Sequence, residues 1–207
     1  MKLLFICLIG YLFGCIHGSQ IIGNYKNVNI KKSGVKNAGA SNTTLVLGWK
    51  YGVIVALIDV CKAIISILFI IFLLNHYGIS QETQIVYIYL NALFVIIGHN
   101  YPITMKFSGG KGTASFFGLM LMIDWKTFLI GFCILLILAF ATDYLVIGVL
   151  SMYISFVFYT YFSYGWLPVL IAFCLLSLSL MKHIENYRRI LNNQEIRLSS
   201  FLRNQTS

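Results

Sequence analysis

The chain has 207 residues, of which 59% are hydrophobic and only 10% are charged, and its mean hydropathy is +0.84. Soluble domains carry roughly a quarter charged residues, so this composition argues against a soluble globular protein and predicts a chain surrounded by lipid. A net charge of +9 indicates a protein that binds either nucleic acid or a membrane. Here the cations lie in short loops between apolar stretches, which argues against nucleic acid.

The first apolar stretch, residues 3–23, is predicted to be a retained transmembrane helix. It begins like a secretory signal peptide, but apolar residues resume at Ile21 after the polar Ser19. Gly14 and Gly18 have the small-x-x-x-small spacing that lets helices approach closely. We therefore expect this span to pack tightly against a neighbour.

A long polar stretch, residues 24–50, separates this span from the rest of the membrane segment. The further predicted spans are about 51–74, 84–100, 113–123, 126–141, 143–162 and 166–181. The segment 113–123 is too short to cross upright, and the tail that follows residue 181 is expected to form a helix at or just beyond the membrane surface.

Twelve of the fifteen Lys and Arg residues lie in three regions, namely 24–50, 101–112 and 182–207, whereas the turns at 75–83 and 162–165 contain none. Because cytoplasmic loops carry the excess of Lys and Arg, all three regions are predicted to be cytoplasmic. The expected fold is an all-α integral membrane protein, a single polytopic domain over 1–207. It has about seven transmembrane helices, an outside N-terminus and a cytoplasmic C-terminus; a five-helix version that merges short neighbours stays open.

The second basic loop contains the sharpest local motif, Gly109-Gly110-Lys111-Gly112. Three glycines around a lysine give a backbone that can present N–H groups beside an ammonium, which suits a phosphate group. The motif is not a Walker A loop, because Gly112 stands where Ser or Thr is required. The alternative is a flexible basic turn at the membrane surface.

The first loop offers a second candidate anion site between Ser33 and Asn42, where small residues, Asn amides and Lys36 follow one another. Such runs are also common in ordinary solvated loops. In the tail, His183 and Asn186 lie one turn apart on the same helical face, and Glu185 and Arg189 are spaced for an ion pair. A charged helix with internal pairs is the alternative there.

Two ionisable residues, Asp59 and Lys62, lie three positions apart inside the second span. Charged side chains within a span are costly, so they indicate a functional or interhelical role, or else an ion pair near the interface. His99 ends the third span, and Thr104 stands five positions later, so the H-x-x-x-x-D motif of one large class of glycerolipid acyltransferases is absent.

Taken together and in order, the three loops resemble the acyl-phosphate-dependent glycerol-3-phosphate acyltransferases of bacteria, the PlsY family, over essentially the whole chain. The family's G-S-G-N-x-G-A-T-N is matched by Gly34, Asn37, Gly39, Ala40, Ser41 and Asn42, and its D-x-x-K by Asp59 and Lys62. Its G-H-x(7-8)-F-x-G-G-K-G-x-A is matched by Gly98, His99, Phe107, Gly109, Gly110, Lys111, Gly112 and Ala114. Its H-R-E-N-x-x-R-L-x-x-G-x-E is matched by His183, Glu185, Asn186, Arg189, Leu191 and Glu195.

The chain departs from this pattern at five positions. The family serine and the next glycine fall at Val35 and Lys36, and an arginine after the first motif falls at Leu45. In the third motif an arginine falls at Ile184 and a glycine at Asn193. A hydroxyl and a guanidinium are thus missing from the first loop, for which Lys36 or a nearby serine is a candidate substitute.

The resemblance implies transfer of a fatty acyl group from acyl phosphate to the sn-1 hydroxyl of glycerol 3-phosphate, giving lysophosphatidic acid and phosphate, without cofactor or metal. The implied partners are these two substrates, membrane lipid and the enzyme that supplies acyl phosphate, and the implied location is the inner membrane of a bacterium. No nucleophilic Ser-His-Asp set is visible, and none is needed, because phosphate is a good leaving group. The chemistry requires positioning and charge stabilisation.

The resemblance also implies roles for individual residues. The expected catalytic residues are Lys111, His183 and Asn186. The expected substrate-binding residues are Lys36, Asn37, Gly39, Ser41, Asn42, Gly109, Gly110, Gly112 and Arg189. The expected supporting residues are Asp59, Lys62, His99 and Glu195.

Two other functions stay open on the sequence. A non-catalytic relative that binds phosphorylated lipid precursors is suggested by the losses at Val35, Leu45 and Ile184. A small organic-phosphate transporter would need charged or broken helices at mid-membrane, and Asp59, Lys62 and Asp143 are the ionisable residues that bear on it.

Overall fold

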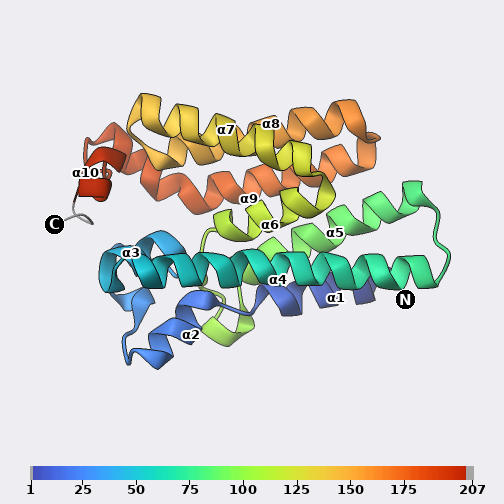
Figure 1. Cartoon of the computed structure of the whole chain (residues 1–207), viewed down its shortest axis with the longest axis horizontal. Helices are drawn as coiled ribbons and strands as arrows, with labels where there is room; N and C mark the ends of the chain where they lie inside the picture. The colour runs from blue at the N-terminus through green and yellow to red at the C-terminus, as the bar shows by residue number, and fades with distance from the viewer. Residues whose placement is uncertain (1, 204–207) are drawn as a thin grey trace. The chain divides into compact units, whose positions relative to one another are not determined.

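The computed structural model describes residues 2–203, and every regular element in that range is helical, which confirms the all-α prediction. The helices are α1 Lys2–Gly14, α2 Gly18–Tyr25, α3 Ala40–Leu47, α4 Trp49–His76, α5 Gln81–Asn100, α6 Thr113–Ile123, α7 Trp125–Thr142, α8 Leu145–Ser163, α9 Trp166–Leu191 and α10 Leu198–Arg203 (Figure 1). Two short 3-10 helices, η1 Ile30–Lys32 and η2 Ile103–Met105, lie in the first two loops.

Six helical segments of the described chain are long and apolar enough to cross a membrane. They are α1 with α2, α4, α5 with η2, α7, α8 and α9. Helix α6 has 11 residues and, at about 1.5 Å per residue, extends only about 16 Å, roughly half of a hydrocarbon core. The predicted set of about seven apolar helices therefore consists of six full-length candidates and one short helix.

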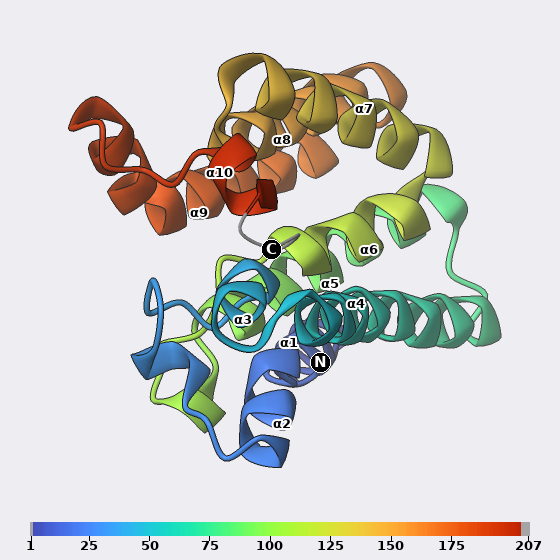
Figure 2. The same cartoon turned by 60° about the vertical axis from the view of Figure 1, so that its left-hand side comes forward.

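The helices form two compact units, unit 1 up to Ile123 and unit 2 from Asp124 onward. In unit 1, α4 contacts α1, α2, α3, α5 and α6, and so forms the centre of the unit (Figures 1 and 2). In unit 2, α8 packs against both α7 and α9. Short turns join these helices, so neighbours in sequence are antiparallel neighbours in space.

Glycines bring the first span close to its neighbours, as their spacing predicts. A Cβ atom on Gly14 would lie 2.8 Å from the Cα atom of Gly98 in α5. A Cβ atom on Gly18 would lie 2.8 Å from the carbonyl oxygen of Val55 in α4. Because a real Cβ atom does not fit at such distances, only glycine allows both contacts.

Two predicted boundaries are wrong. The continuous helix expected over 3–23 is broken, because α1 ends at Gly14 and α2 begins at Gly18. The tail expected to form one helix after residue 181 is divided, because α9 continues through to Leu191, residues 192–197 are not helical and the short α10 follows. The third motif therefore begins on the last turns of a long apolar helix, and its Glu195 follows the end of that helix.

The tail is attached to the turn between α7 and α8. Asp143 adopts a left-handed conformation (φ 62°) there, and its carboxylate accepts hydrogen bonds from the backbone N–H and the hydroxyl of Ser199 at 2.8 and 2.7 Å. These bonds, the backbone one first, hold the pKa of Asp143 below its ordinary value. The start of α10 is thereby held against unit 2's own helices.

Candidate active site

The first motif loop is organised around the side chain of Asn42, which is fully buried at the start of α3. Its Oδ1 atom accepts a hydrogen bond from the backbone N–H of Val35 at 2.8 Å. Its Nδ2 group donates to the carbonyl oxygens of Ile30, Ser33 and Asn37 at 2.8, 3.0 and 2.8 Å. One amide therefore holds together the loop that precedes it, and we assign Asn42 to supporting the loop rather than to touching substrate.

We expect Asn42→Ala to loosen this loop, because it leaves buried backbone groups without partners. The cost should be about 1–3 kcal/mol, so hydrogen exchange over residues 30–42 should become roughly five to a hundred times faster. Exchange measured by mass spectrometry in detergent would show this. Asn24→Ala, which removes an exposed amide from α2, is the matched control and should leave exchange unchanged.

The other predicted binding residues of the loop lie around this amide. Lys36 is exposed and left-handed (φ 55°), at a corner of the loop. Asn37 is half-buried, Ser41 is exposed, and Gly39 is the N-cap of α3 with its backbone extended. Val35, which stands at the position of the family serine, is 40% exposed. The loop thus presents a lysine at the surface and an aliphatic side chain next to it.

Behind this loop, the ion pair of Asp59 and Lys62 is buried at the centre of unit 1. The two side chains are 1% and 2% exposed and lie 2.9 Å apart. The Lys62 ammonium also donates to the carbonyl oxygens of Gly14 and Ile16 at 3.1 and 2.5 Å, which the break after α1 leaves open. Asp59 in turn accepts from the N–H of Gly18 at 3.4 Å, at the start of α2. The pair therefore satisfies both ends of the broken helix.

Two histidines complete this buried cluster. His99 accepts a hydrogen bond at Nδ1 from the Lys62 ammonium at 2.8 Å, and its carbonyl oxygen accepts one from Nε2 of His17 at 2.9 Å. The imidazole rings lie 4.5 Å apart. Candidate ligand atoms of His17, Asp59 and His99 lie within 4.8 Å of one another, but the ammonium of Lys62 already contacts two of these residues and supplies the positive charge of the cluster.

The second motif loop folds back onto this cluster. The backbone N–H groups of Gly109 and Gly110 donate to the carbonyl oxygens of Asn100 and His99, both at 3.1 Å. These two amides are therefore engaged in shaping the loop, which corrects the expectation that all amides from 109 to 112 face a phosphate. The two glycines are needed because the loop passes so close to the ring and carbonyl of His99.

We expect Gly110→Ala to destabilise unit 1. A Cβ atom there would collide with the His99 ring and lie 2.8 Å from the carbonyl oxygen of Ala38 in the first loop. Overpacking of this kind costs about 1–3 kcal/mol, which thermal unfolding in detergent would register as a lower midpoint. Gly165→Ala is the control, because a Cβ atom there meets nothing within 4 Å; an equal effect of the two substitutions would contradict the close packing of the loop.

Lys111 and Gly112 lie where this loop enters α6. Gly112 has a φ of 84°, which glycine adopts readily, and its carbonyl oxygen accepts the first bond of the helix from Phe116 at 2.8 Å. Lys111 is half-buried immediately before this helix start. A lysine next to a helix N-terminus combines an ammonium with the positive end of the helix dipole, and this arrangement favours an anion such as phosphate.

In unit 2, the predicted catalytic residue His183 lies on α9 and is 4% exposed. Its Nδ1 atom lies 2.9 Å from the carbonyl oxygen of Ser179. Because a carbonyl only accepts, Nδ1 carries the hydrogen, and in the neutral ring Nε2 is the basic atom. The ring thus has the tautomer that a general base acting through Nε2 requires.

Glu195, which follows the end of α9, holds two other motif residues. Its carboxylate accepts from the Nδ2 group of Asn186 and from the Nε group of Arg189, each at 2.6 Å. Arg189 therefore pairs with Glu195 and not with Glu185, which corrects the pair expected from spacing. This geometry fixes the orientation of both side chains, as the supporting role predicted for Glu195 requires.

Sequence reasoning missed His17 and Ser115. The hydroxyl of Ser115 lies 3.4 Å from Nδ1 of His99, at the start of α6. A histidine inside an apolar span was the available signal for His17, because ionisable residues in spans mark special roles. No pattern in the sequence distinguishes Ser115 from other serines.

The sequence as a whole matches known proteins. The model of the glycerol-3-phosphate acyltransferase family matches residues 4–193. Glycerol-3-phosphate acyltransferase 1 of Oceanobacillus iheyensis is 60% identical over 193 residues, 93% of each chain. Glycerol-3-phosphate acyltransferase 2 of Thermotoga maritima is 32% identical, covering 95% of this chain and 96% of the relative.

The fold matches solved structures as well. A crystal structure of PlsY, an integral membrane glycerol 3-phosphate acyltransferase, in its glycerol 3-phosphate form has a TM-score of 0.84 at 28% identity, covering 95% of this chain and 96% of that one. The lysophosphatidic acid form of PlsY has a TM-score of 0.83 at 28% identity, covering 98% and 99%.

Proposed function

This chain belongs to the glycerol-3-phosphate acyltransferase family, and we propose that it transfers a fatty acyl group from acyl phosphate to the sn-1 hydroxyl of glycerol 3-phosphate. The observation that carries the proposal is the second motif loop, which the cluster around His99 holds so that Lys111 lies just before the start of α6. An ammonium at a helix N-terminus is a site for a phosphate group, and both substrates carry one.

The reaction needs no covalent enzyme intermediate. The hydroxyl oxygen forms a bond to the acyl carbonyl carbon, the bond from that carbon to the phosphate oxygen breaks, and inorganic phosphate leaves with the bond electrons. The hydroxyl proton must pass to a base, and we assign it to Nε2 of His183, with a phosphate oxygen of the substrate able to share the task. The products are lysophosphatidic acid and phosphate.

The other residues position the two phosphates. Lys111 is assigned to the phosphate of acyl phosphate, whose negative charge grows as it leaves. Lys36 and Asn37 of the first loop are assigned to the phosphate of glycerol 3-phosphate. Asn186 and Arg189, fixed by Glu195, are assigned to the acceptor. Electrostatic complementarity and orientation, both set before substrate arrives, supply the rate enhancement.

The location proposed for this chain is the inner membrane of a bacterium, with the motif loops cytoplasmic and the N-terminus outside. The excess of Lys and Arg supports this orientation, because the loops after α2 and α5 are basic while residues 77–80 between α4 and α5 contain no charge. In Figure 1 both basic loops lie in the left-hand half of unit 1, whereas the uncharged turn lies at its right-hand end.

The decisive test is an acyl-transfer assay with purified protein, palmitoyl phosphate and radiolabelled glycerol 3-phosphate. We expect labelled lysophosphatidic acid and an equal amount of inorganic phosphate. Palmitoyl coenzyme A is the comparison donor; product formed from it in place of the phosphate would contradict the proposed donor. Product formed only after Val35→Ser with Leu45→Arg would show that the natural chain is a non-catalytic relative.

A further inference from the structure

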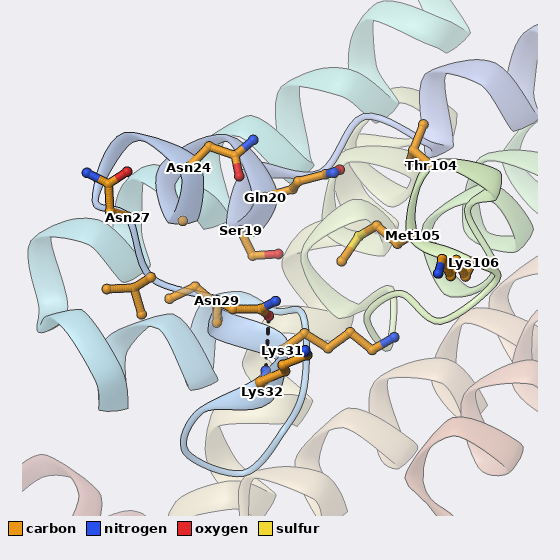
Figure 3. A pocket seen from close by; sticks show the side chains of 13 residues that line it. Ser19, Gln20, Asn24, Asn27, Asn29, Lys31, Lys32, Thr104, Met105 and Lys106 are labelled. Atoms are coloured by element: carbon orange, nitrogen blue, oxygen red, sulfur yellow. Dashed lines mark hydrogen bonds between the residues drawn. The ribbon is translucent and has the colours of Figure 1, made fainter.

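A cavity of about 750 Å³ lies in unit 1 and is lined in part by the first two basic loops (Figure 3). It is lined by residues of α2 and η1, between positions 19 and 32, and by residues 104–106 of the second loop. None of its lining residues belongs to the set assigned above to catalysis, substrate binding or support. Its volume is in the range of small-molecule sites, about 300–1,000 Å³.

The cavity is positively charged. Lys31, Lys32 and Lys106 line it, and no acidic residue does (Figure 3). Unit 1 contains only two carboxylates, and neither neutralises these lysines, because Asp59 is buried with Lys62 and Glu82 lies in the first turn of α5. Three cations without a paired anion, in the described part of the chain, create a potential that attracts an anionic ligand.

A buried hydroxyl points into the same space. Ser19 is 2% exposed, and within residues 2–203 its Oγ atom has no hydrogen-bond partner. Figure 3 shows this hydroxyl directed into the cavity, with the amides of Asn24 and Asn29 near it. A buried polar group without a partner is costly, about 1–3 kcal/mol, unless a ligand or water supplies the missing bond.

These donors suit a phosphate group. A phosphate has several acceptor oxygens and up to two negative charges, which match three ammonium groups and a hydroxyl. Exposed apolar side chains flank the lining residues in sequence, namely Ile21 and Tyr25 on α2 and Ile103 and Phe107 around η2. Such neighbours can contact acyl chains, so a lipid headgroup fits the site in addition to free phosphate.

We propose that this cavity is a second phosphate-binding site, separate from the site of acyl transfer, which takes the phosphate headgroup of an anionic lipid or free phosphate. Lys31, Lys32 and Lys106 supply the charge, and Ser19 supplies a buried hydrogen bond. The site does not depend on the function proposed above, because none of these four residues has a part in that chemistry.

Footprinting of lysines tests the proposal directly. The protein in neutral detergent is treated with an amine-acetylating reagent, and modification of each lysine is read by peptide mass spectrometry. Phosphatidic acid, or inorganic phosphate at matched ionic strength, should slow modification of the three cavity lysines about tenfold at ten times its dissociation constant. Lys50, an exposed lysine of the same unit, should react at an unchanged rate, and phosphatidylcholine should protect none.

The outcomes separate the sources of the phosphate. Protection by phosphatidic acid alone identifies a lipid headgroup, and equal protection by phosphate identifies the free ion. No protection by either, or equal slowing at Lys50, overturns the proposal. Protection by glycerol 3-phosphate at the concentrations that saturate acyl transfer would also overturn it, because the cavity would then be part of the substrate site.

Two variants sharpen the result. Ser19→Ala removes a hydroxyl that makes no bond within the described chain, so folding should be unaffected while the footprint shifts to severalfold higher ligand concentration, about fivefold to tenfold for one lost hydrogen bond. Lys31→Gln with Lys32→Gln should abolish protection of Lys106, whereas Lys50→Gln should not. An unchanged footprint in both cavity variants would contradict the site even if acyl transfer proceeds normally.

Discussion

Lys111→Ala should lower the rate of acyl transfer by about a hundred- to a thousandfold. Lys111 is the only cation of the run Gly109-Gly110-Lys111-Gly112 and lies just before α6, where we propose that its ammonium and the helix dipole act on the same phosphate. Removing the charge leaves the glycine loop in place, since Gly109 and Gly110 are held by the carbonyl oxygens of His99 and Asn100. The loss should therefore appear in the chemical step and not in folding.

The control for this prediction is Lys50→Ala, which removes an exposed lysine from the first turn of α4 in the same unit. Both variants should be recovered from the membrane fraction in wild-type amounts and elute identically in gel filtration. Rates are compared with saturating palmitoyl phosphate and glycerol 3-phosphate. Undiminished transfer by Lys111→Ala would exclude this lysine from catalysis and leave the phosphate site of the second loop without its charge.

Most of the fold could be predicted because its signals are local. Long apolar runs specify α4, α5, α7, α8 and α9, and the breaks at Asp124, Asp143 and residues 164–165 depend on neighbouring residues only. Asp124, for example, accepts the N–H of Lys126 at 2.7 Å and so caps α7. Signals of this kind do not depend on contacts with residues distant in sequence.

The break between α1 and α2 could not be predicted, because its cause is not local. Residues 15–17 contain no proline or glycine, and an isolated helix would continue through them. The open carbonyl oxygens of Gly14 and Ile16 are satisfied by Lys62, 48 and 46 positions away. Only the tertiary structure shows that this lysine and the break belong together.

The same difference between local and tertiary information appears at Asn42. The motif places an asparagine in a loop rich in small residues, which is compatible both with binding substrate and with shaping the loop. Its four hydrogen bonds to Ile30, Ser33, Val35 and Asn37 show that the second role uses both ends of the amide. Residue type and spacing identify Asn42 as an important position, whereas its hydrogen-bond partners in the structure show what its side chain does there.

The broken first span also bears on transport as an alternative function. Transporters use broken helices and charged side chains at mid-membrane to hold a substrate, and α1, α2, Asp59 and Lys62 have that composition. Here, however, the two charged groups bind each other and the helix ends, and both are almost fully buried. The break is closed by the protein itself, so it supports a rigid base for the motif loops and not a transport site.

This rigid base depends on the positive charge of Lys62. Lys62→Met should destabilise the protein by about 3–5 kcal/mol, the cost of leaving one charge of a buried pair alone. Asp59 would be buried without its cation, and the carbonyl oxygens of Gly14 and Ile16 would lose their donor. Thermal unfolding in detergent should show a much lower midpoint, and acyl transfer should fall with it because His99 loses the contact that orients its ring.

The control lies on the same helix: Lys50→Met makes the same substitution at an exposed position of α4 and should change the midpoint little.

Adding Asp59→Asn to Lys62→Met removes the lone charge but leaves the carbonyl oxygens of Gly14 and Ile16 without a donor, so stability should recover only in part. The expected order is therefore wild type, then the double variant, then Lys62→Met alone. If the double variant were as stable as wild type, the two charges would neutralise each other without stabilising the ends of α1 and α2. If Lys62→Met were as stable as Lys50→Met, the broken helix would not depend on Lys62. Partial recovery is the result that ties a charged pair in α4 to the ends of α1 and α2, and through His99 to the loop that carries Lys111.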